Sequence, residues 1–259
     1  MGNIDKEISV IMDIYNAYNE DVISKSDKDD LIYLIESTED RDFEFNLNLW
    51  KRNTSKNILF VTGISGSGKS TLASKMAKEN GAINIEVDLL EHNDILFDKS
   101  VKQDKANLIM KEYMEKTYGG AHKFKTSDTT SFTKEVIKFI IYIIKYAKEH
   151  KEDLFIVEGI QIADASTWNP SNTKVDGPNT KKTMDLSMRL MDIISSYPVI
   201  VKKTSILKSM KRAVDREGGF SEYKKTFSSL ASIKEYLSWY IEMDKNRKQF
   251  INNLKKSNS

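Results

Sequence analysis

The sequence of 259 residues contains no cysteine, which excludes a disulfide framework, a thiol nucleophile and a cysteine-ligated metal site. Long apolar runs are also missing: the most apolar window, Val136 to Ile144, contains Lys138 and is far too short to span a bilayer. The first residues lack the basic start and the apolar stretch of a signal peptide. These absences predict a soluble, cytoplasmic protein without a membrane partner.

An excess of charge of one sign is absent as well, because 40 basic residues are balanced by 38 acidic ones, for a net charge of +2. This balance of charge does not favour a nucleic-acid partner, although it leaves room for a local basic patch on the surface. The lysine-rich stretch from Lys245 to Lys256 is interpreted as a solvated helix face rather than a binding stripe. The chain is long enough for one large domain with an appendage.

The most informative stretch is rich in glycine and fits the pattern G-x-x-x-x-G-K-[ST]; it runs Gly63, Ile64, Ser65, Gly66, Ser67, Gly68, Lys69, Ser70. An apolar segment at 57–62 precedes it and predicts a buried parallel strand, and residues from Thr71 onward predict a helix. This context favours a phosphate-binding loop over a chance surface loop.

The chemistry of such a loop follows from its backbone. Glycines let the amide groups point at a phosphate chain, and the helix that follows adds the positive end of its dipole. Lys69 can then reach the β- and γ-phosphates, and the Ser70 hydroxyl can bind Mg²⁺. We therefore expect a nucleoside triphosphate to bind through residues Gly63 to Thr71. A guanine-reading Asn-Lys-x-Asp segment is missing, which favours ATP.

Strands alternate with helices along the chain, which predicts an α/β protein with a mainly parallel sheet covered by helices on both faces. The expected strands cover 57–62, 82–88, 154–159 and 198–201. The expected helices cover 101–117, 131–150, 183–196 and 205–217, with helical pattern again over 221–257 and in the N-terminal region. Strict alternation from Phe43 to Leu49 suggests a further strand. Residues 164–182 contain two of the three prolines and predict a long loop, typical of a lid or binding loop.

Two acidic residues end predicted strands, at the edge where parallel sheets bind ligands. Asp88 closes the strand at 82–88, where a carboxylate can accept the proton of a substrate hydroxyl or hold Mg²⁺ through water. An ordinary helix cap is the alternative. Glu158 follows four apolar residues, as a Walker B acid does, and would coordinate Mg²⁺. A glycine comes next, rather than the second acid with which mechanical ATPases activate water.

Basic residues follow the fourth predicted strand and share one helix face through spacings of three and four; they are Lys208, Lys211, Arg212 and Arg216. Such residues can neutralise the charge that spreads over a transferring phosphoryl group. A solvated helix with internal pairing, for instance Lys211 with Asp215, is the alternative.

These motifs resemble the uridine kinase and phosphoribulokinase branch of the P-loop kinases, and zeta-toxin kinases are similar in the same parts. The resemblance covers roughly 57–217. It implies that Lys69 stabilises the transferring phosphoryl, that Asp88 is the base and that Arg212 and Arg216 are lid arginines, with Ser70, Glu158 and Asp88 around Mg²⁺. Two features depart from the family: a fifth core strand is not evident after the lid, and the N-terminal extension is foreign to it.

We therefore expect a P-loop NTPase fold in which 1–52 form an extension packed on a kinase-like domain at 53–259. That domain would have lids at 164–182 and 205–217 and a helical part at 220–257. It would transfer the γ-phosphate of ATP, with Mg²⁺, to a hydroxyl of a nucleoside, sugar or nucleotide-sugar. A switch-type or regulatory ATPase remains open. So does a polynucleotide 5′-kinase that uses basic and aromatic residues, namely Tyr113, Tyr118, His122, Lys123, Phe124 and Lys125. The oligomeric state is not predicted.

Overall fold

The computed structural model describes residues 41–100, 103–124, 129–166, 178–206, 208–209, 212 and 230–257. The chain divides into two compact units. The sheet unit comprises Asp42–Ile64, Gly68–Lys202 and Lys245–Ser259, and the second unit comprises Met1–Arg41, Ser65–Ser67 and Lys203–Asp244.

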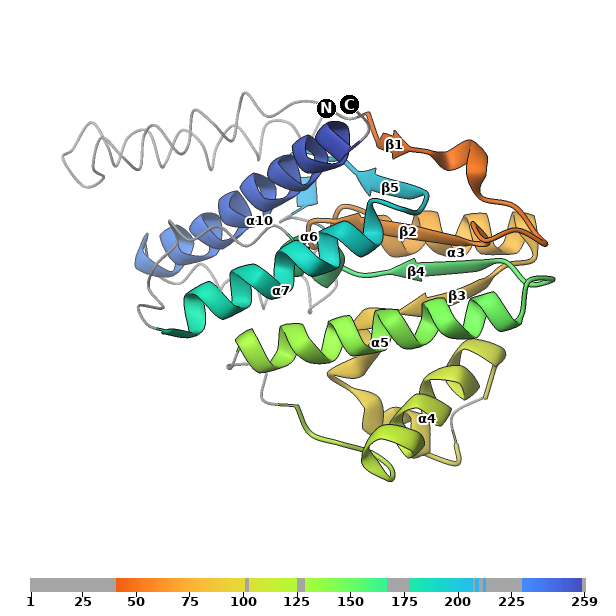
Figure 1. Ribbon diagram of the computed structural model, residues 1–259. Coiled ribbons are helices and arrows are strands. Elements are labelled where there is room, and N and C mark those ends of the chain that lie inside the picture. Colours follow the sequence, from red (N-terminus) through yellow and green to blue (C-terminus); the bar gives the residue numbers. More distant parts are fainter. Residues whose placement is uncertain are drawn as a thin grey trace. The chain divides into compact units, whose positions relative to one another are not determined.

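In the described part of the sheet unit, five strands form one sheet in the order β1-β5-β2-β4-β3 (Figure 1). Four of them are parallel: β2 (Ile58–Gly63), β3 (Ile83–Glu86), β4 (Phe155–Glu158) and β5 (Val199–Lys202). The predicted α/β class with a mainly parallel sheet is confirmed.

The fifth strand comes from the N-terminal side of the glycine-rich loop. β1 (Phe43–Phe45) pairs antiparallel with β5, with Phe43 opposite Val201 and Phe45 opposite Val199. An ion pair of 3.0 Å between Lys202 and Asp42 continues this pairing. The strand predicted up to Leu49 is shorter than expected, because Asn46 adopts a left-handed φ of 51° and starts the 3-10 turn η1 (Leu47–Leu49).

The helices of the sheet unit are α3 (Lys69–Asn80), α4 (Lys105–Tyr118), α5 (Thr129–Glu149), α6 (Gln161–Ser166) and α7 (Pro178–Ile194). Two 3-10 turns, η2 (Val87–Leu90) and η3 (Asn93–Phe97), follow β3. α10 (Leu230–Ser257) begins in the second unit, and its residues from Lys245 onward belong to the sheet unit. Among the described helices, none combines the length and the apolar character needed to cross a bilayer.

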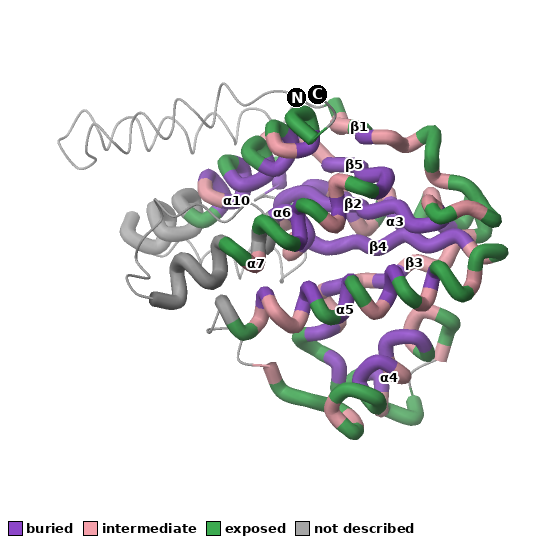
Figure 2. Tube along the Cα trace, viewed as in Figure 1, coloured by how far each residue is buried: buried purple, intermediate pink, exposed green. Residues whose placement is uncertain are grey.

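Each strand alternates between two apolar layers, so that both faces of the sheet are covered. Ile58 and Phe60 of β2 belong to the large cluster that includes α4, α5 and α7. Leu59 and Val61 belong to the smaller cluster built with α3. Figure 2 shows the central strands as an almost continuous buried layer. The face toward α3 lies next to the glycine-rich loop, because α3 follows that loop directly.

Two segments predicted from the sequence have wrong boundaries. The strand predicted over 82–88 stops at Glu86, and Asp88 lies on η2, because Val87 and Leu90 are both buried in the large cluster, whereas an extended strand would place them on opposite faces. The loop predicted over 164–182 is shorter at both ends, because α6 extends to Ser166 and α7 begins at Pro178. Proline is well suited to the first position of a helix, because an N–H group at that position would form no hydrogen bond within the helix. Residues 167–177 lie outside the described residues.

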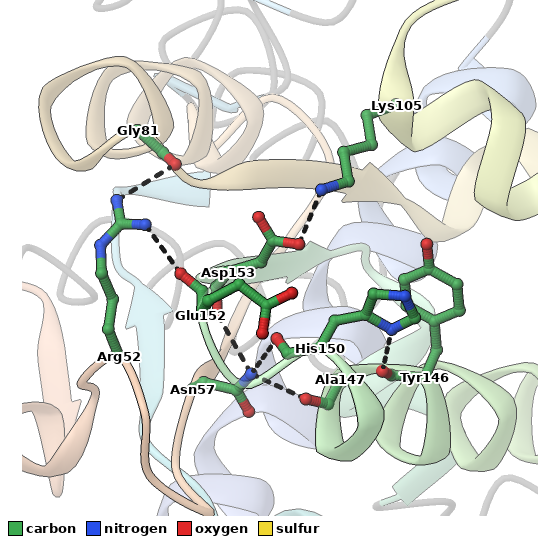
Figure 3. A network of polar contacts seen from close by, with 9 residues as sticks. All are labelled: Arg52, Asn57, Gly81, Lys105, Tyr146, Ala147, His150, Glu152 and Asp153. Atoms are coloured by element: carbon green, nitrogen blue, oxygen red, sulfur yellow. Dashed lines mark hydrogen bonds and ion pairs between the residues drawn. The ribbon is translucent and has the colours of Figure 1, made fainter.

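A polar network ties the strands and helices together at the amino ends of the strands (Figure 3). The buried Asn57 amide donates to the carbonyls of Ala147, His150 and Asp153 at 2.9, 3.2 and 3.1 Å. Arg52 donates to the carbonyls of Asn80, at the C-terminus of α3, and Glu152 at 2.6 and 3.0 Å. The C-terminus of α3 is therefore fixed, and its N-terminus lies at the opposite edge of the sheet.

Candidate functional site

The glycine-rich loop follows β2, the strand at which the order of the sheet reverses. From β2 the chain crosses beyond β4 to reach β3, whereas β5 lies on the other side of β2. In open parallel sheets, ligands bind outside the carboxyl ends of the strands at such a reversal. The fold thus places the loop where this topology favours a ligand site.

α3 begins at Lys69 and presents free amide groups at its first turn. Gly68 is the N-cap, with a φ of 90°, and has no side chain with which to cap these amides. The first turn also contains no acidic residue. Uncapped amides and the helix dipole together attract an anion at a helix N-terminus.

The apex of the loop, Ser65–Ser67, belongs to the second unit and packs there against residues of the predicted lid helix. Gly66 has a φ of 75°, and a Cβ at this position would lie 2.0 Å from the carbonyl oxygen of Ser209. Only glycine fits this close approach. The Arg212 guanidinium makes a long contact of 3.5 Å with the carbonyl oxygen of Ser67. Lys211 and Arg216 lie outside the described residues.

Glu158 ends β4 and is the most buried acidic residue beside α3. It is only 2% exposed, and strand alternation places it on the same face as Ile156, toward α3. Burial raises the pKa of Glu158 to about 7, although the charge of Lys69 and a hydrogen bond with Ser70 act to lower it. Its Oε2 atom has no hydrogen-bond partner among the described residues. A buried carboxyl oxygen without a protein partner is satisfied by a proton, by water or by a cation.

Asp88 lies two residues beyond the end of β3, on the turn η2. It is half-buried, and its Oδ1 atom has no hydrogen-bond partner among the described residues. Its negative charge contributes to raising the pKa of Glu158. The structure thus brings Lys69, Ser70, Glu158 and Asp88 together at one edge of the sheet unit.

Glu86 is absent from the site predicted from the sequence, yet it belongs to this group. It ends β3, and its Cα is the register partner of the Cα of Glu158. Burial raises the pKa of Glu86, and Asp88 adds to the effect, whereas Lys69 acts to lower it. The alternation of the predicted strand contained the signal, because residues 84, 86 and 88 share one face of an extended strand.

The acidic side chains do not form a metal cage by themselves. Among the described residues, no three Asp, Glu or His side chains converge closely enough to hold an ion. Mg²⁺ normally keeps several waters and takes one or two carboxylates together with phosphate oxygens. Ser70, Glu158 and Asp88 fit such a partial ligand set, and the unpartnered Glu158 oxygen is the observation that favours it.

The aromatic residues proposed for a nucleic-acid channel pack largely within the sheet unit. Tyr113 is 3% exposed in the large cluster, and Tyr118 and Phe124 pack against that cluster. The exposed His122 ring stacks on Tyr118, with 4.4 Å between ring centroids. A buried Tyr113 is not available for base stacking, and Lys125 lies outside the described residues.

In comparison with known proteins, no protein-family model matches the chain and no curated protein is significantly similar to it. The class of the protein therefore rests on its fold, an α/β unit with a mainly parallel sheet.

Proposed function

We propose that this chain is a P-loop phosphotransferase of the kinase type, which moves the γ-phosphate of ATP to a hydroxyl of a small molecule. The acceptor class is a nucleoside, a sugar or a nucleotide-sugar. One observation carries the proposal: Lys69 and Ser70 start an uncapped helix beside the buried Glu158, whose Oε2 atom lacks a hydrogen-bond partner among the described residues. This arrangement combines an anion site with a cation site, which a metal–triphosphate complex requires.

In this proposal the loop amides from Gly63 to Thr71 bind the phosphates, and Lys69 neutralises the transferring phosphoryl group. Ser70 and Glu158 hold Mg²⁺ directly or through water, with Asp88 nearby. When bound, Mg²⁺ supplies positive charge at the β- and γ-phosphate oxygens.

Asp88 is proposed as the base that accepts the proton of the acceptor hydroxyl. Its place on a turn, rather than within the strand, leaves it half-buried at the carboxyl edge of the sheet. Arg212 is proposed as a lid arginine, supported by its contact with the loop carbonyl of Ser67. Arg216 is proposed for the same role from its sequence position alone.

Transfer to an alcohol is favoured over hydrolysis by the residue after Glu158. Gly159 stands where mechanical ATPases have a second acid that activates water, and a Cβ here would collide with Val87. A second carboxylate therefore has no room at this position. Phosphoryl transfer without water then depends on an acceptor that fills the site.

The test combines binding with turnover. ATP affinity is measured by calorimetry for the native chain, for Lys69→Ala and for the control Lys75→Ala, whose side chain is exposed on α3. We expect Lys69→Ala to weaken binding by at least about tenfold, since a charge-assisted contact is lost, and Lys75→Ala to have no effect.

Transfer of the labelled γ-phosphate of ATP is then measured in the presence of each alcohol of a panel, and its release is measured in the absence of any acceptor. Transfer to one class of alcohol, reduced by about 10²-fold or more in Asp88→Asn, supports the proposal. Strong hydrolysis without any acceptor would instead indicate a switch-type ATPase, and a chain that binds no nucleotide would refute both.

A further inference from the structure

We propose that Glu86 is a further functional carboxylate of this site, which makes nucleotide binding depend on the divalent cation. Glu86 repels the phosphates when Mg²⁺ is absent and holds the hydrated ion when Mg²⁺ is present. This inference rests on the proposed nucleotide site and adds a residue and a regulatory property to it.

The placement of Glu86 follows from register and alternation. Ile83 and Ile85 face the large cluster, so Glu86 lies on the opposite face, toward α3. Its Cα is opposite that of Glu158 on β4, and Glu158 is opposite Val61 on β2. Neighbouring strands are about 4.8 Å apart, so the Cα of Glu86 lies roughly 10 Å from that of Val61, two residues before the end of β2.

The charges around Glu86 do not balance within the described residues. Glu86, Glu158 and Asp88 interact with one another, and both glutamates interact with a single buried lysine, Lys69. When ionised, these four groups have a net charge that a divalent cation would cancel. Asp104 also acts on Glu86, but its carboxylate already accepts the amide of Asn107 and caps α4.

The atoms without partners point to a ligand rather than to internal pairing. Glu158 is almost completely buried, and its Oε2 has no hydrogen-bond partner among the described residues. Asp88 has one such oxygen as well. Lys69 and the Ser70 hydroxyl leave these two oxygens without a partner, and a cation with its water shell would supply one.

If Glu86 takes part in cation-dependent nucleotide binding, its replacement gives a result that the loss of a purely structural residue would not give. Replacing Glu86 with glutamine keeps its size and removes its charge. Without metal, the loss of a negative charge near the phosphates strengthens nucleotide binding. With metal, the loss of a ligand to the hydrated ion weakens it. The two effects have opposite signs, so the coupling between metal and nucleotide decreases.

ADP affinity is therefore measured by calorimetry for the native chain and for Glu86→Gln, both in EDTA and in excess Mg²⁺. In EDTA the variant is expected to bind ADP about threefold to tenfold more tightly than the native chain. In Mg²⁺ it is expected to bind ADP more weakly by a similar factor. Glu79→Gln, on the exposed side of α3, is the matched control and leaves both values unchanged.

Two results overturn the assignment: equal changes of affinity in EDTA and in Mg²⁺, or no change in either. If Glu86→Gln does not fold, Glu86→Asp provides the test, because it keeps the charge on a shorter side chain. That variant must retain the repulsion in EDTA and lose part of the Mg²⁺ effect.

If the native chain itself does not bind ADP, or if Lys69→Ala binds it as well as the native chain, the proposed function fails. If native binding stands and only the coupling is unaffected, the role of Glu86 alone fails.

Discussion

Gly159 lies directly against Val87, so that a Cβ built on Gly159 would come 2.8 Å from the Cβ of Val87. Gly159 follows Glu158 at the end of β4, and Val87 is the first residue of the turn that holds Asp88. The contact therefore sets the separation of the backbone segments that present these two carboxylates. A glycine is required here for close approach rather than for its backbone freedom.

Replacing Gly159 with alanine should destabilise the chain, because the new methyl group has no space beside Val87 and the Gln161 side chain. We expect the free energy of unfolding to fall by about 1–3 kcal/mol, as for other overpacked interiors. Urea denaturation measures this change. In a Val87→Gly background the same substitution should cost less. Strictly additive costs in the double variant would contradict the contact.

The elements that were predicted well are those fixed by local pattern. The apolar runs at β2 and β4 and the long amphipathic stretch of α5 determine their own secondary structure, whatever they pack against. The motif likewise predicted a helix directly after the loop, from Thr71 onward, and α3 begins two residues earlier at Lys69. Candidate residues of this kind are accessible from sequence alone.

The features that were missed depend on contacts between distant segments. β3 ends at Glu86 because Val87 and Leu90 are buried in the large cluster, which the strand pattern does not reveal. The edge position of β1 depends on pairing with β5, more than 150 residues later in the chain. The partnership of Glu86 with Glu158 is a matter of register between β3 and β4. These relationships require the tertiary structure.

Replacing Asn57 with alanine should cost about 2 kcal/mol, because three carbonyls lose a shared buried donor. Asn57→Asp should cost more, at least about 3 kcal/mol at neutral pH, because a carboxylate would then face the same carbonyls without a donor. Denaturation of both variants at pH 7 measures the difference.

The Asp variant also has a pH signature. Protonation of its carboxyl restores one donor, so its deficit relative to Asn57→Ala should shrink in acid. An Asp variant that matches the Ala variant at every pH would show that the amide donors of Asn57 contribute little.

Replacing Arg52 with alanine should lower stability by about 1 kcal/mol, since its guanidinium donates to carbonyls at the end of α3 and at Glu152 but is exposed to solvent. Arg52→Lys should recover only part of this loss, because an ammonium group cannot reproduce the planar fork. ADP affinity should stay unchanged in both variants, since α3 spans about 18 Å between Arg52 and Lys69. A large loss of affinity would show that this network acts on the loop.

The Glu158 carboxyl should make the chain less stable as the pH rises, when metal and nucleotide are absent. Burial raises its pKa from 4.5 to about 7, so the folded chain binds a proton more tightly than the unfolded chain does. The stabilisation is complete below pH 4.5, decreases between pH 4.5 and 7, and amounts at most to about 3 kcal/mol.

The free energy of unfolding is measured in urea with EDTA, from pH 5 to pH 8, for the native chain and for Glu158→Gln. The variant lacks this titration, so the stability of the native chain relative to the variant should fall across this range. A relative stability that rises with pH would mean that the carboxylate is stabilised in the folded chain, contrary to its burial beside Glu86 and Asp88.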